Sequence, residues 1–171
     1  MDDVLGRPPI QFGPGAGLYR NDLFQIAYVT NDIERALKVF ADRYGVKEWR
    51  RMEGDLKEGG HIRVEFGWAG GSLFEVTQAD GAGSELYREP LPAGDAFAIR
   101  FHHFGYFIPT EEAWQALLKE IDEGGVKVFN ETNVPGFLQA RIVEAPDLGH
   151  WIEYIYPEAG GVAFFQGAPS N

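Results

Sequence analysis

One order of sequence patterns occurs twice along the chain, and this repetition constrains the fold more than any other feature. In each half, an alternating apolar segment typical of a strand is followed by a helical pattern and then by three further strand-like segments. The sequence therefore predicts an internal duplication of a β-α-β-β-β unit of roughly 60 residues. The first unit contains strands 23–29, 47–52, 61–68 and 72–77 with helix 31–45, and the second contains strands 97–108, 126–129, 137–144 and 151–156 with helix 110–124.

The two helices carry recognisable start and stop signals. Asn31 is followed three residues later by Glu34, which predicts a capping box, and Gly45 closes this helix. Two such modules predict an α+β fold in which a curved mixed β-sheet surrounds a metal or ligand cavity and the helices lie outside. The predicted division is an N-terminal arm 1–21, a first βαβββ module 22–77, a linker 78–96, a second module 97–157 and a C-terminal tail 158–171.

Charge and hydropathy exclude several classes of partner. The chain has 15 Lys and Arg against 26 Asp and Glu, a net charge of −11, whereas nucleic acids and anionic membranes attract basic surfaces. No apolar run approaches the roughly 20 residues of a membrane span, and the acidic N-terminus does not resemble a signal peptide. We therefore expect a cytoplasmic protein that binds a small molecule and neither nucleic acid nor membrane.

The chain has no cysteine, which excludes disulfides, thiolate metal sites and a cysteine nucleophile. Any metal site must therefore use histidine, carboxylate, amide and water. Four strand-like segments each carry one such side chain among apolar neighbours, two in the first strands of the units and two in the last strands. A pseudo-twofold relation between the units would place these four side chains around one cavity. The predicted metal ligands are Gln25, Glu75, His103 and Glu153.

Two adjacent histidines occupy the apolar segment FHHFGYFIP (101–109). Because successive side chains of a strand point to opposite faces, only one of them can face a given site. Alternation predicts that His103 faces the cavity and that His102 faces the helix layer. We interpret His102 as structural, together with His61 and His150, which lie beside loops.

Each predicted ligand also has a structural interpretation. A glutamine in an apolar strand is usually a buried amide bonded to the backbone, and a strand histidine often donates to a carbonyl. Buried carboxylates are costly unless they are paired or bind a metal, although glutamates at strand ends are often simply exposed. The symmetric placement of all four residues favours the metal site.

Several basic and aromatic residues are candidates for a substrate pocket. The two arginines lie in the middle of strands and could anchor an acidic substrate, although a solvated strand face also accounts for them. The aromatic residues, like the late segment GVAFF (161–165), fit either a pocket wall or ordinary core. The candidates are Arg63, Trp68, Phe101, Phe107, Arg141 and Trp151.

The ligand set predicts a type of chemistry. One imidazole, one amide oxygen and two carboxylates suit a divalent ion with open coordination positions, such as Zn²⁺, Ni²⁺, Co²⁺, Mn²⁺ or Mg²⁺. A substrate carbonyl could be polarised there while a carboxylate removes the proton α to it and the ion stabilises the enediolate. We expect Glu153 to be this base, with Glu75 the next candidate. Iron-dependent ring cleavage is disfavoured, because its facial triad needs two histidines and one carboxylate and the predicted set has one histidine.

The duplicated order and four motifs resemble a known family. The motifs are QIAYVTNDIERAL, LFEVT, HHFGYFIPT and APDLGHWIEYI, and they resemble the vicinal oxygen chelate superfamily over roughly residues 22–157. That superfamily includes glyoxalase I, methylmalonyl-CoA epimerase, extradiol dioxygenases, fosfomycin-resistance enzymes and bleomycin-binding proteins. Its metal ligands come from the first and last strands of each module, which implies the same Gln25, Glu75, His103 and Glu153.

The resemblance implies an activity and an assembly. A Gln/Glu/His/Glu set is similar to that of animal-type glyoxalase I, which implies a metal-dependent lyase or isomerase of the lactoylglutathione lyase type. Homodimers are common in the superfamily, so we expect one here. The basic residues that would hold a glutathione carboxylate are not matched. The alternatives are an epimerase, or a non-catalytic binding protein of the resistance type with the same fold and no metal.

Overall fold

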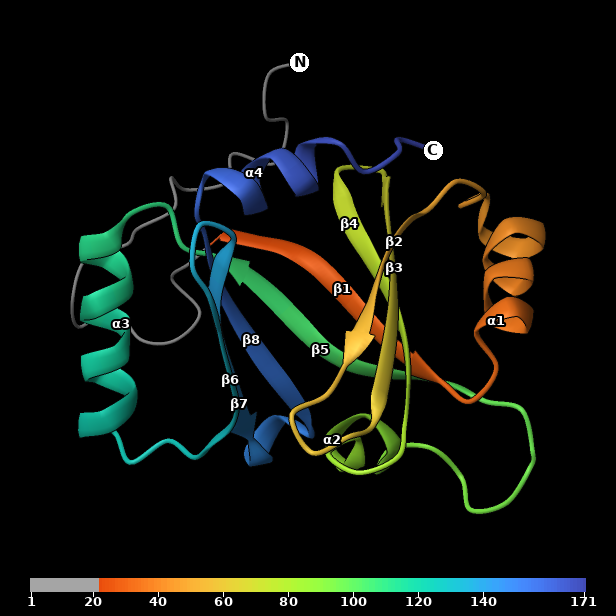
Figure 1. Ribbon diagram of the computed structural model, residues 1–171, viewed down its shortest axis with the longest axis horizontal. Coiled ribbons are helices and arrows are strands. Elements are labelled where there is room, and N and C mark those ends of the chain that lie inside the picture. The colour runs from red at the N-terminus through yellow and green to blue at the C-terminus, as the bar shows by residue number, and fades with distance from the viewer. Residues whose placement is uncertain (1–21) are drawn as a thin grey trace.

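The computed structural model describes residues 22–171, so the predicted N-terminal arm 1–21 lies outside the described residues. Eight strands form one strongly curved mixed sheet in the order β2-β3-β4-β1-β5-β8-β7-β6, with α1 and α3 on its outside (Figure 1). This confirms the predicted α+β fold, although β2, β5 and β6 begin two or three residues later than predicted. The strands are β1 Asp22–Thr30, β2 Arg50–Asp55, β3 His61–Ala69, β4 Ser72–Asp80, β5 Ile99–Phe107, β6 Val128–Val134, β7 Leu138–Ala145 and β8 His150–Pro157.

The helices include two short elements that the sequence patterns did not predict. One is α2 in the segment expected to be a linker, and the other is α4 in the segment expected to be a tail. The helical segments are α1 Ile33–Val39 with its π-helical extension Phe40–Tyr44, α2 Glu85–Arg88, α3 Glu111–Glu123, a 3₁₀ turn Pro146–Leu148 and α4 Ala159–Gln166.

The antiparallel pair β1–β5 joins the two modules at the centre of the sheet, and its register has the predicted pseudo-twofold symmetry. Two register shifts interrupt it, and each leaves one extra residue, Phe24 in β1 and His102 in β5. Each extra residue comes directly before a predicted metal ligand, so both modules contain the same irregularity at the same place. The paired residues are Leu23 with Tyr106, Gln25 with Gly105, Ala27 with His103 and Tyr28 with Phe101.

The N-cap of the first helix lies one residue later than predicted. Asp32, and not Asn31, is its N-cap, because the Asp32 carboxylate accepts a hydrogen bond of 3.0 Å from the Arg35 backbone N–H. Asn31 instead donates to the Ala96 carbonyl and accepts from the Ala98 backbone N–H. The predicted capping box is therefore wrong, since the Asn31 side chain fastens the segment before β5 to the end of β1.

Three apolar clusters hold the helices to the sheet. One lies under α3, a second lies under α1, and the third lies inside the curve of the sheet, where α4 crosses one end (Figure 1). In this inner cluster Phe165 and Ala168 pack against Val64 of the first module and Leu138 of the second. The C-terminal segment is thus part of the core that both modules share.

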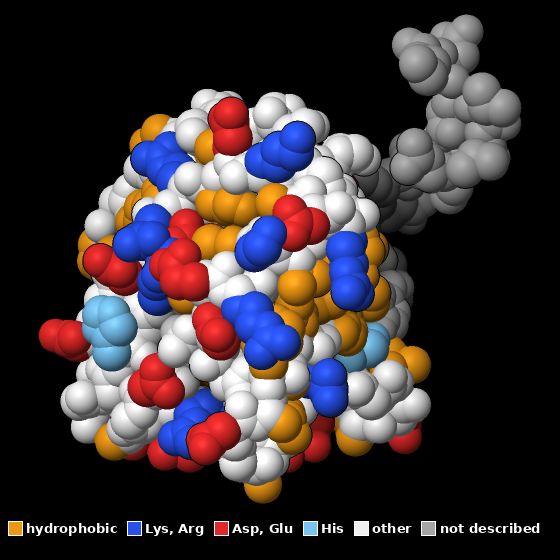
Figure 2. All heavy atoms as spheres, turned by 90° about the vertical axis from the view of Figure 1, so that its right-hand side faces the viewer, with side chains coloured by type: hydrophobic (Ala, Val, Ile, Leu, Met, Phe, Trp, Pro, Cys, Tyr) orange, Lys and Arg blue, Asp and Glu red, His pale blue; other side chains and the backbone are white. Residues whose placement is uncertain are grey.

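The outer face around α1 carries acidic and basic side chains interspersed, as Figure 2 shows. Lys38 and Asp42 form one such exposed pair, with 2.6 Å between Nζ and the carboxylate oxygen. None of the described helices is long and apolar enough to cross a membrane.

Candidate metal centre

The structure brings the four predicted ligands together from four neighbouring strands of one chain. The ligand atoms of Glu75, His103 and Glu153 all lie within 4.8 Å of one another. The Gln25 amide nitrogen lies 2.5 Å from Glu75 Oε2, 3.3 Å from His103 Nε2 and 3.5 Å from Glu153 Oε2. The Gln25 side-chain amide therefore occupies the point on which the other three groups converge.

The strand register explains this convergence. Glu75 lies beside Ala27 in the parallel pair β1–β4, and Glu153 lies beside Gly105 in the equivalent pair β5–β8. A Cβ atom added at Gly105 would lie 2.7 Å from Gln25 Cβ, too close for any side chain. Glycine at position 105 thus lets the Gln25 side chain cross the neighbouring strand and reach the carboxylates.

The donor set fits a divalent cation. Gln25 Oε1 is buried and has no hydrogen-bond partner, whereas its amide nitrogen donates to Glu75. Orphaned buried acceptors are rare in native proteins, and the oxygen and nitrogen of an amide are assigned from their hydrogen-bond partners. A cation among the two carboxylates and the imidazole would favour the opposite amide orientation, with Oε1 as a fourth ligand. Three oxygens and one nitrogen suit the predicted ions.

His102 supports His103, contrary to the prediction from strand alternation. The extra residue in β5 turns both rings to the same side, so that His102 Nδ1 lies 2.7 Å from His103 Nδ1. His102 does not face the layer of α1 and α3; its ring stacks on Tyr87 of α2, with 5.5 Å between the ring centroids. The prediction was wrong because alternation of side chains fails at a bulge.

The hydrogen bonds of His102 fix the tautomers of both rings. His102 Nε2 lies 3.1 Å from the Leu86 carbonyl oxygen, which can only accept, so this nitrogen carries a proton. In a neutral His102 the Nδ1 atom is then an acceptor, and His103 Nδ1 must donate to it. His103 Nε2, which faces Glu153 at 3.1 Å, is left as the atom able to bind a metal.

Burial and mutual contact shift the pKa values of these groups. Burial is the largest cause that raises the pKa of Glu75 to about 7, and Glu153 raises it further, while His103 and a hydrogen bond from Thr77 lower it. Burial lowers the pKa of His103, but the carboxylates of Glu153 and Glu75 outweigh burial and raise it. Burial and the neighbouring His103 lower the pKa of His102 to about 3, which keeps its ring neutral.

A cavity of about 710 Å³ lies beside the four residues, inside the curve of the sheet. Gln25, Glu75 and Glu153 form part of its wall, and His103 lies behind them in contact with Gln25 and Glu153. Tyr87 also reaches the wall from α2, and burial raises the pKa of its hydroxyl, as do the nearby carboxylates. A small molecule in this cavity would touch the candidate metal ligands directly.

The two arginines predicted for the pocket are both held by acidic partners. Arg141 borders the cavity, but its guanidinium lies over the Trp114 ring of α3 at 5.6 Å and pairs with Glu131 at 3.2 Å. Arg63 lies on the outer face of β3, where it pairs with Glu34 and Glu65. Ion pairs on the strand faces therefore account for both arginines, and neither guanidinium points at the candidate ligands.

The four predicted aromatic pocket residues do not border the cavity. Their rings pack instead against other aromatic rings in and around the core, as large apolar side chains usually do. Trp68 packs against Phe24, Phe107 against Phe24, Phe101 against Tyr28, and Trp151 against Phe129. The histidines interpreted as structural also lie outside the ligand group: His61 contacts Asp55 and His150 contacts Phe104.

A family model described as the Glyoxalase/Bleomycin resistance protein/Dioxygenase superfamily matches residues 24–143, more than half of the chain. The chain belongs to this superfamily. The match confirms the family resemblance of the sequence motifs. A search of curated proteins finds no match.

Solved structures share the superfamily fold at low sequence identity. Methylmalonyl-CoA epimerase from Mycobacterium tuberculosis is 12% identical with a TM-score of 0.61, and covers 87% of this chain and 95% of its own. A hypothetical protein from Bacillus halodurans is 17% identical, with a TM-score of 0.58 and coverage of 80% and 94%. A Streptomyces coelicolor methylmalonyl-CoA epimerase variant, in complex with 2-nitronate-propionyl-CoA, is 13% identical, with a TM-score of 0.54 and coverage of 81% and 98%.

Sequence reasoning missed several residues that build this superfamily site. Tyr87 lies in a segment rich in glycine, proline and charge, whose composition predicts a linker and not a cavity wall. Asn130, Glu131 and Thr132 line the cavity from β6. Phe164 and Phe165 of α4 also line it, and the segment GVAFF was the one signal for them.

Proposed function

We propose that this protein is a metal-dependent enzyme that removes and returns a proton α to a carbonyl group. The observation that carries the proposal is the convergence of Glu75, His103 and Glu153 within 4.8 Å around the Gln25 amide, whose buried oxygen has no partner. Two buried or half-buried carboxylates so close together repel each other, and their burial is costly unless a cation offsets it. The arrangement therefore supports a site built to hold a divalent ion.

The two glutamates are suited to different roles. Glu75 is buried, and the Thr77 hydroxyl holds one of its oxygens at 2.7 Å, which leaves the other for an ion. Glu153 contacts His103 with one oxygen, and its side chain is 15% exposed to the cavity. We therefore assign Glu75 to binding the ion and Glu153 to moving the proton, since a base must reach the substrate.

A divalent ion held by Gln25, Glu75, His103 and Glu153 would polarise the substrate carbonyl and stabilise the charge that proton removal creates. Neighbouring side chains orient the groups that would hold the ion. His103 is oriented by His102, and Glu75 is oriented by Thr77.

Within this class we propose the glyoxalase I type of isomerisation, because the Gln/Glu/His/Glu set resembles that of glyoxalase I. Epimerisation is the second candidate, since it needs the same proton transfer and epimerases share the fold at 12–13% identity. The two reactions differ in their products. Adducts of 2-oxoaldehydes with thiols would be rearranged by the first, and chiral 2-substituted thioesters would be racemised by the second.

The test is metal content together with proton exchange. We expect the purified protein to contain a stoichiometric divalent ion by mass spectrometry and to exchange the α proton of a substrate for deuterium in heavy water. His103→Ala should abolish metal binding, because the site loses its nitrogen ligand. His61→Ala, which removes an exposed histidine beside Asp55, is the matched control and should retain the metal.

A protein that takes up no metal from metal-rich medium would contradict the enzyme proposal. The non-catalytic binding protein would then be the better interpretation, because the cavity of about 710 Å³ is large enough for a small ligand without any ion.

Homodimerisation and a cytoplasmic location remain predictions. The edge strands of the sheet are β2 and β6, and exposed edges can pair with another chain. β2 carries the charged sequence RRMEGD, which opposes pairing, whereas β6 exposes Phe129 and Val134. We propose β6 as the dimer contact, and light scattering should report a monomer for Phe129→Glu.

A further inference from the structure

The part of the cavity wall nearest α4 is apolar, whereas residues 53–58 and 130–133 add polar and charged groups elsewhere. Val64 and Phe66 of β3 face inward on one side, and Leu138 and Ala140 of β7 face inward on the other. α4 closes one end with Phe164, which packs on the Phe66 ring with 5.4 Å between centroids. A ligand at the metal centre would therefore meet hydrocarbon and aromatic surface on the side toward α4.

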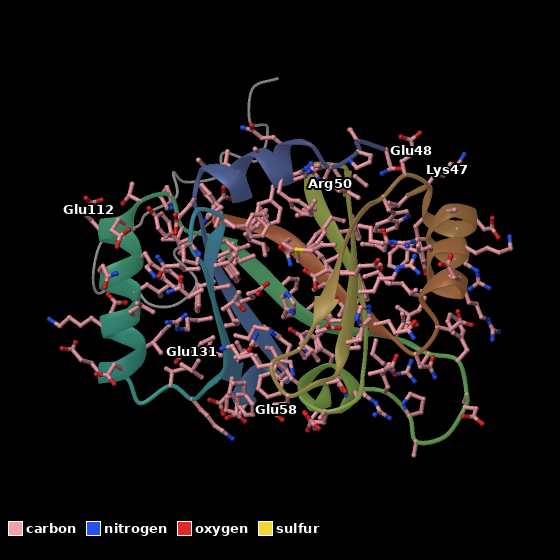
Figure 3. The ribbon with its side chains drawn as sticks, viewed as in Figure 1. Lys47, Glu48, Arg50, Glu58, Glu112 and Glu131 are labelled. Atoms are coloured by element: carbon pink, nitrogen blue, oxygen red, sulfur yellow. The ribbon has the colours of Figure 1, made fainter. Side chains whose placement is uncertain are left out.

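The cations near this cavity are already engaged elsewhere. Arg141 is part of the cavity lining, but it pairs with Glu131, which also lines the cavity. Arg50 donates to the Phe164 carbonyl at 2.9 Å and lies over the Phe164 ring at 4.3 Å. Figure 3 shows Arg50 beside α4, with Glu58 at the opposite end of the sheet near α2. Among the cavity-lining residues that the structure describes, the remaining cation is Lys57, which lies between Asp55 and Glu58 at that end.

We propose that the substrate is an uncharged carbonyl compound with an apolar body, and that carboxylate-bearing or phosphate-bearing compounds such as coenzyme A thioesters are excluded. This proposal rests on the function proposed above and specifies its substrate class. An anion entering the cavity would lose hydration, which is costly, and acidic residues outnumber the cations Lys57 and Arg141 in the wall, where Arg141 is already paired with Glu131. It would also meet the acidic groups Glu75 and Glu153 at the site and Glu58 at the opposite end.

The cavity also limits the size and shape of the substrate. Its volume of about 710 Å³ lies within the usual range for small-molecule sites. The chelating end of the substrate would lie at Glu75 and Glu153, and its apolar body would lie against Phe66 and Phe164. Phe164 is therefore a specificity-determining residue, because it forms the apolar wall at the end that α4 closes.

The experiment compares two probes that differ by one charge, benzohydroxamate and 4-carboxybenzohydroxamate, whose chelating groups are the same. Binding of each to the zinc-loaded and to the zinc-free protein is measured by calorimetry and by ligand-observed NMR. We expect benzohydroxamate to bind at least about tenfold more tightly than 4-carboxybenzohydroxamate, both with and without zinc. The reason is that the cost of burying the carboxylate arises from the cavity wall and not from the ion.

Variants test which surface is responsible. Thr132→Lys places an ammonium on the cavity wall of β6 and should reduce or reverse the preference for the uncharged body; Asn130→Lys is the second variant if the first does not fold. Phe164→Ala should weaken both probes by about tenfold, the equivalent of 1.4 kcal/mol. Val162→Ala, on the exposed side of α4, is the matched control and should change neither.

The outcomes separate this inference from the proposed function. Equal affinity for the two probes, tighter binding of the carboxylate, or no binding of either would overturn the substrate class. A preference for the uncharged body with no effect of zinc would retain the substrate class and overturn the proposed metal-dependent function.

Discussion

The two register shifts in the β1–β5 pair show how one backbone irregularity serves two purposes. In the first module the extra residue is Phe24, whose ring packs among Trp68, Phe107 and Phe165 in the inner core. In the second module it is His102, whose ring orients the imidazole of His103. The backbone of the two halves is equivalent here, so the difference lies entirely in the side chain that the bulge presents.

The last strands of the two modules also place residues at equivalent positions but in different environments. Glu75 and Glu153 have equivalent register positions, beside Ala27 and Gly105. Glu75 is buried and hydrogen-bonded by Thr77, whereas Glu153 is partly exposed to the cavity. A duplicated scaffold can thus hold two carboxylates symmetrically and still give them different environments.

The largest expected effect distinguishes these two glutamates. Glu153→Gln keeps an oxygen donor and nearly the same volume, so the protein should still bind metal, though more weakly. Loss of a general base typically costs roughly 10²–10⁴-fold in rate, or about 3–5 kcal/mol in the barrier. Glu75→Gln should lose more metal affinity than Glu153→Gln. Full turnover by Glu153→Gln, measured as deuterium exchange, would assign the base to Glu75.

The second prediction concerns the small residues that oppose the two first-strand ligands. Gly105 lies opposite Gln25, and a methyl group there would lie 2.7 Å from Gln25 Cβ. Gly105→Ala should therefore displace Gln25 and destabilise the fold by about 1–3 kcal/mol, as overpacking usually does. Its counterpart Ala27, opposite His103, already carries a methyl group. Chemical denaturation of Gly105→Ala and of the milder control Ala27→Gly measures the difference, and an unchanged stability of Gly105→Ala would contradict the close approach.

The third prediction compares the two bulge residues. His102→Phe keeps an aromatic ring beside Tyr87 but removes the acceptor for His103 Nδ1, so metal affinity should fall by about 10–100-fold. His102→Asn, whose amide oxygen can accept the same proton, should recover part of the loss. Nitrogen-15 NMR of wild type should show His103 protonated on Nδ1 and unprotonated on Nε2 when metal is bound.

The matched control for the bulge comparison is Phe24→Leu, which should lower the free energy of unfolding and leave metal affinity unchanged. Equal effects of Phe24→Leu and His102→Phe on metal affinity would mean that His102 acts only through packing.

The last prediction is a pH dependence of metal affinity, which both halves of the site share. The pKa of Glu75 is about 7 and that of His103 is raised, so both groups hold protons in the metal-free protein at mildly acidic pH. Metal must displace these protons, and apparent affinity should therefore rise with pH up to about 7, by about tenfold per pH unit for each proton released. Competition with a chelator between pH 5.5 and 8 measures this, and a flat profile would contradict the raised pKa values.

Much of this arrangement could be predicted from the sequence, because alternation is visible within a single strand and the duplication is visible as a repeated order of elements. Glu75 and Glu153 lie in regular strands, so a period of two indicated correctly that they face the cavity side of the sheet. His102 could not be placed in the same way, since a bulge shifts alternation by one residue and the segment FHHFGYF has no turn residue at that point to indicate it.

The cavity walls were the less predictable part. Arg63 and Arg141 lie in the middle of strands. Their side-chain positions depend on ion pairs with Glu65 and Glu131, which the sequence pattern does not reveal. The helix that carries Phe164 has four glycine or alanine residues in its first five positions, so it shows no clear amphipathic period. Its position depends on contacts with a sheet that is distant in sequence.

The attachment of the C-terminal segment to the first module determines when the cavity can close during folding. The Trp68 backbone N–H donates to the Pro169 carbonyl, and the Asn171 side chain accepts from the backbone N–H of Lys47 across 124 residues. Contacts of such long sequence separation form late, because the intervening chain must first be ordered. On the ribosome the first module would emerge and pair its strands while its inner face still lacked α4. Its apolar inner surface would then stay accessible to chaperones, or to other nascent chains, until α4 and the residues that contact Trp68 and Lys47 had left the ribosome.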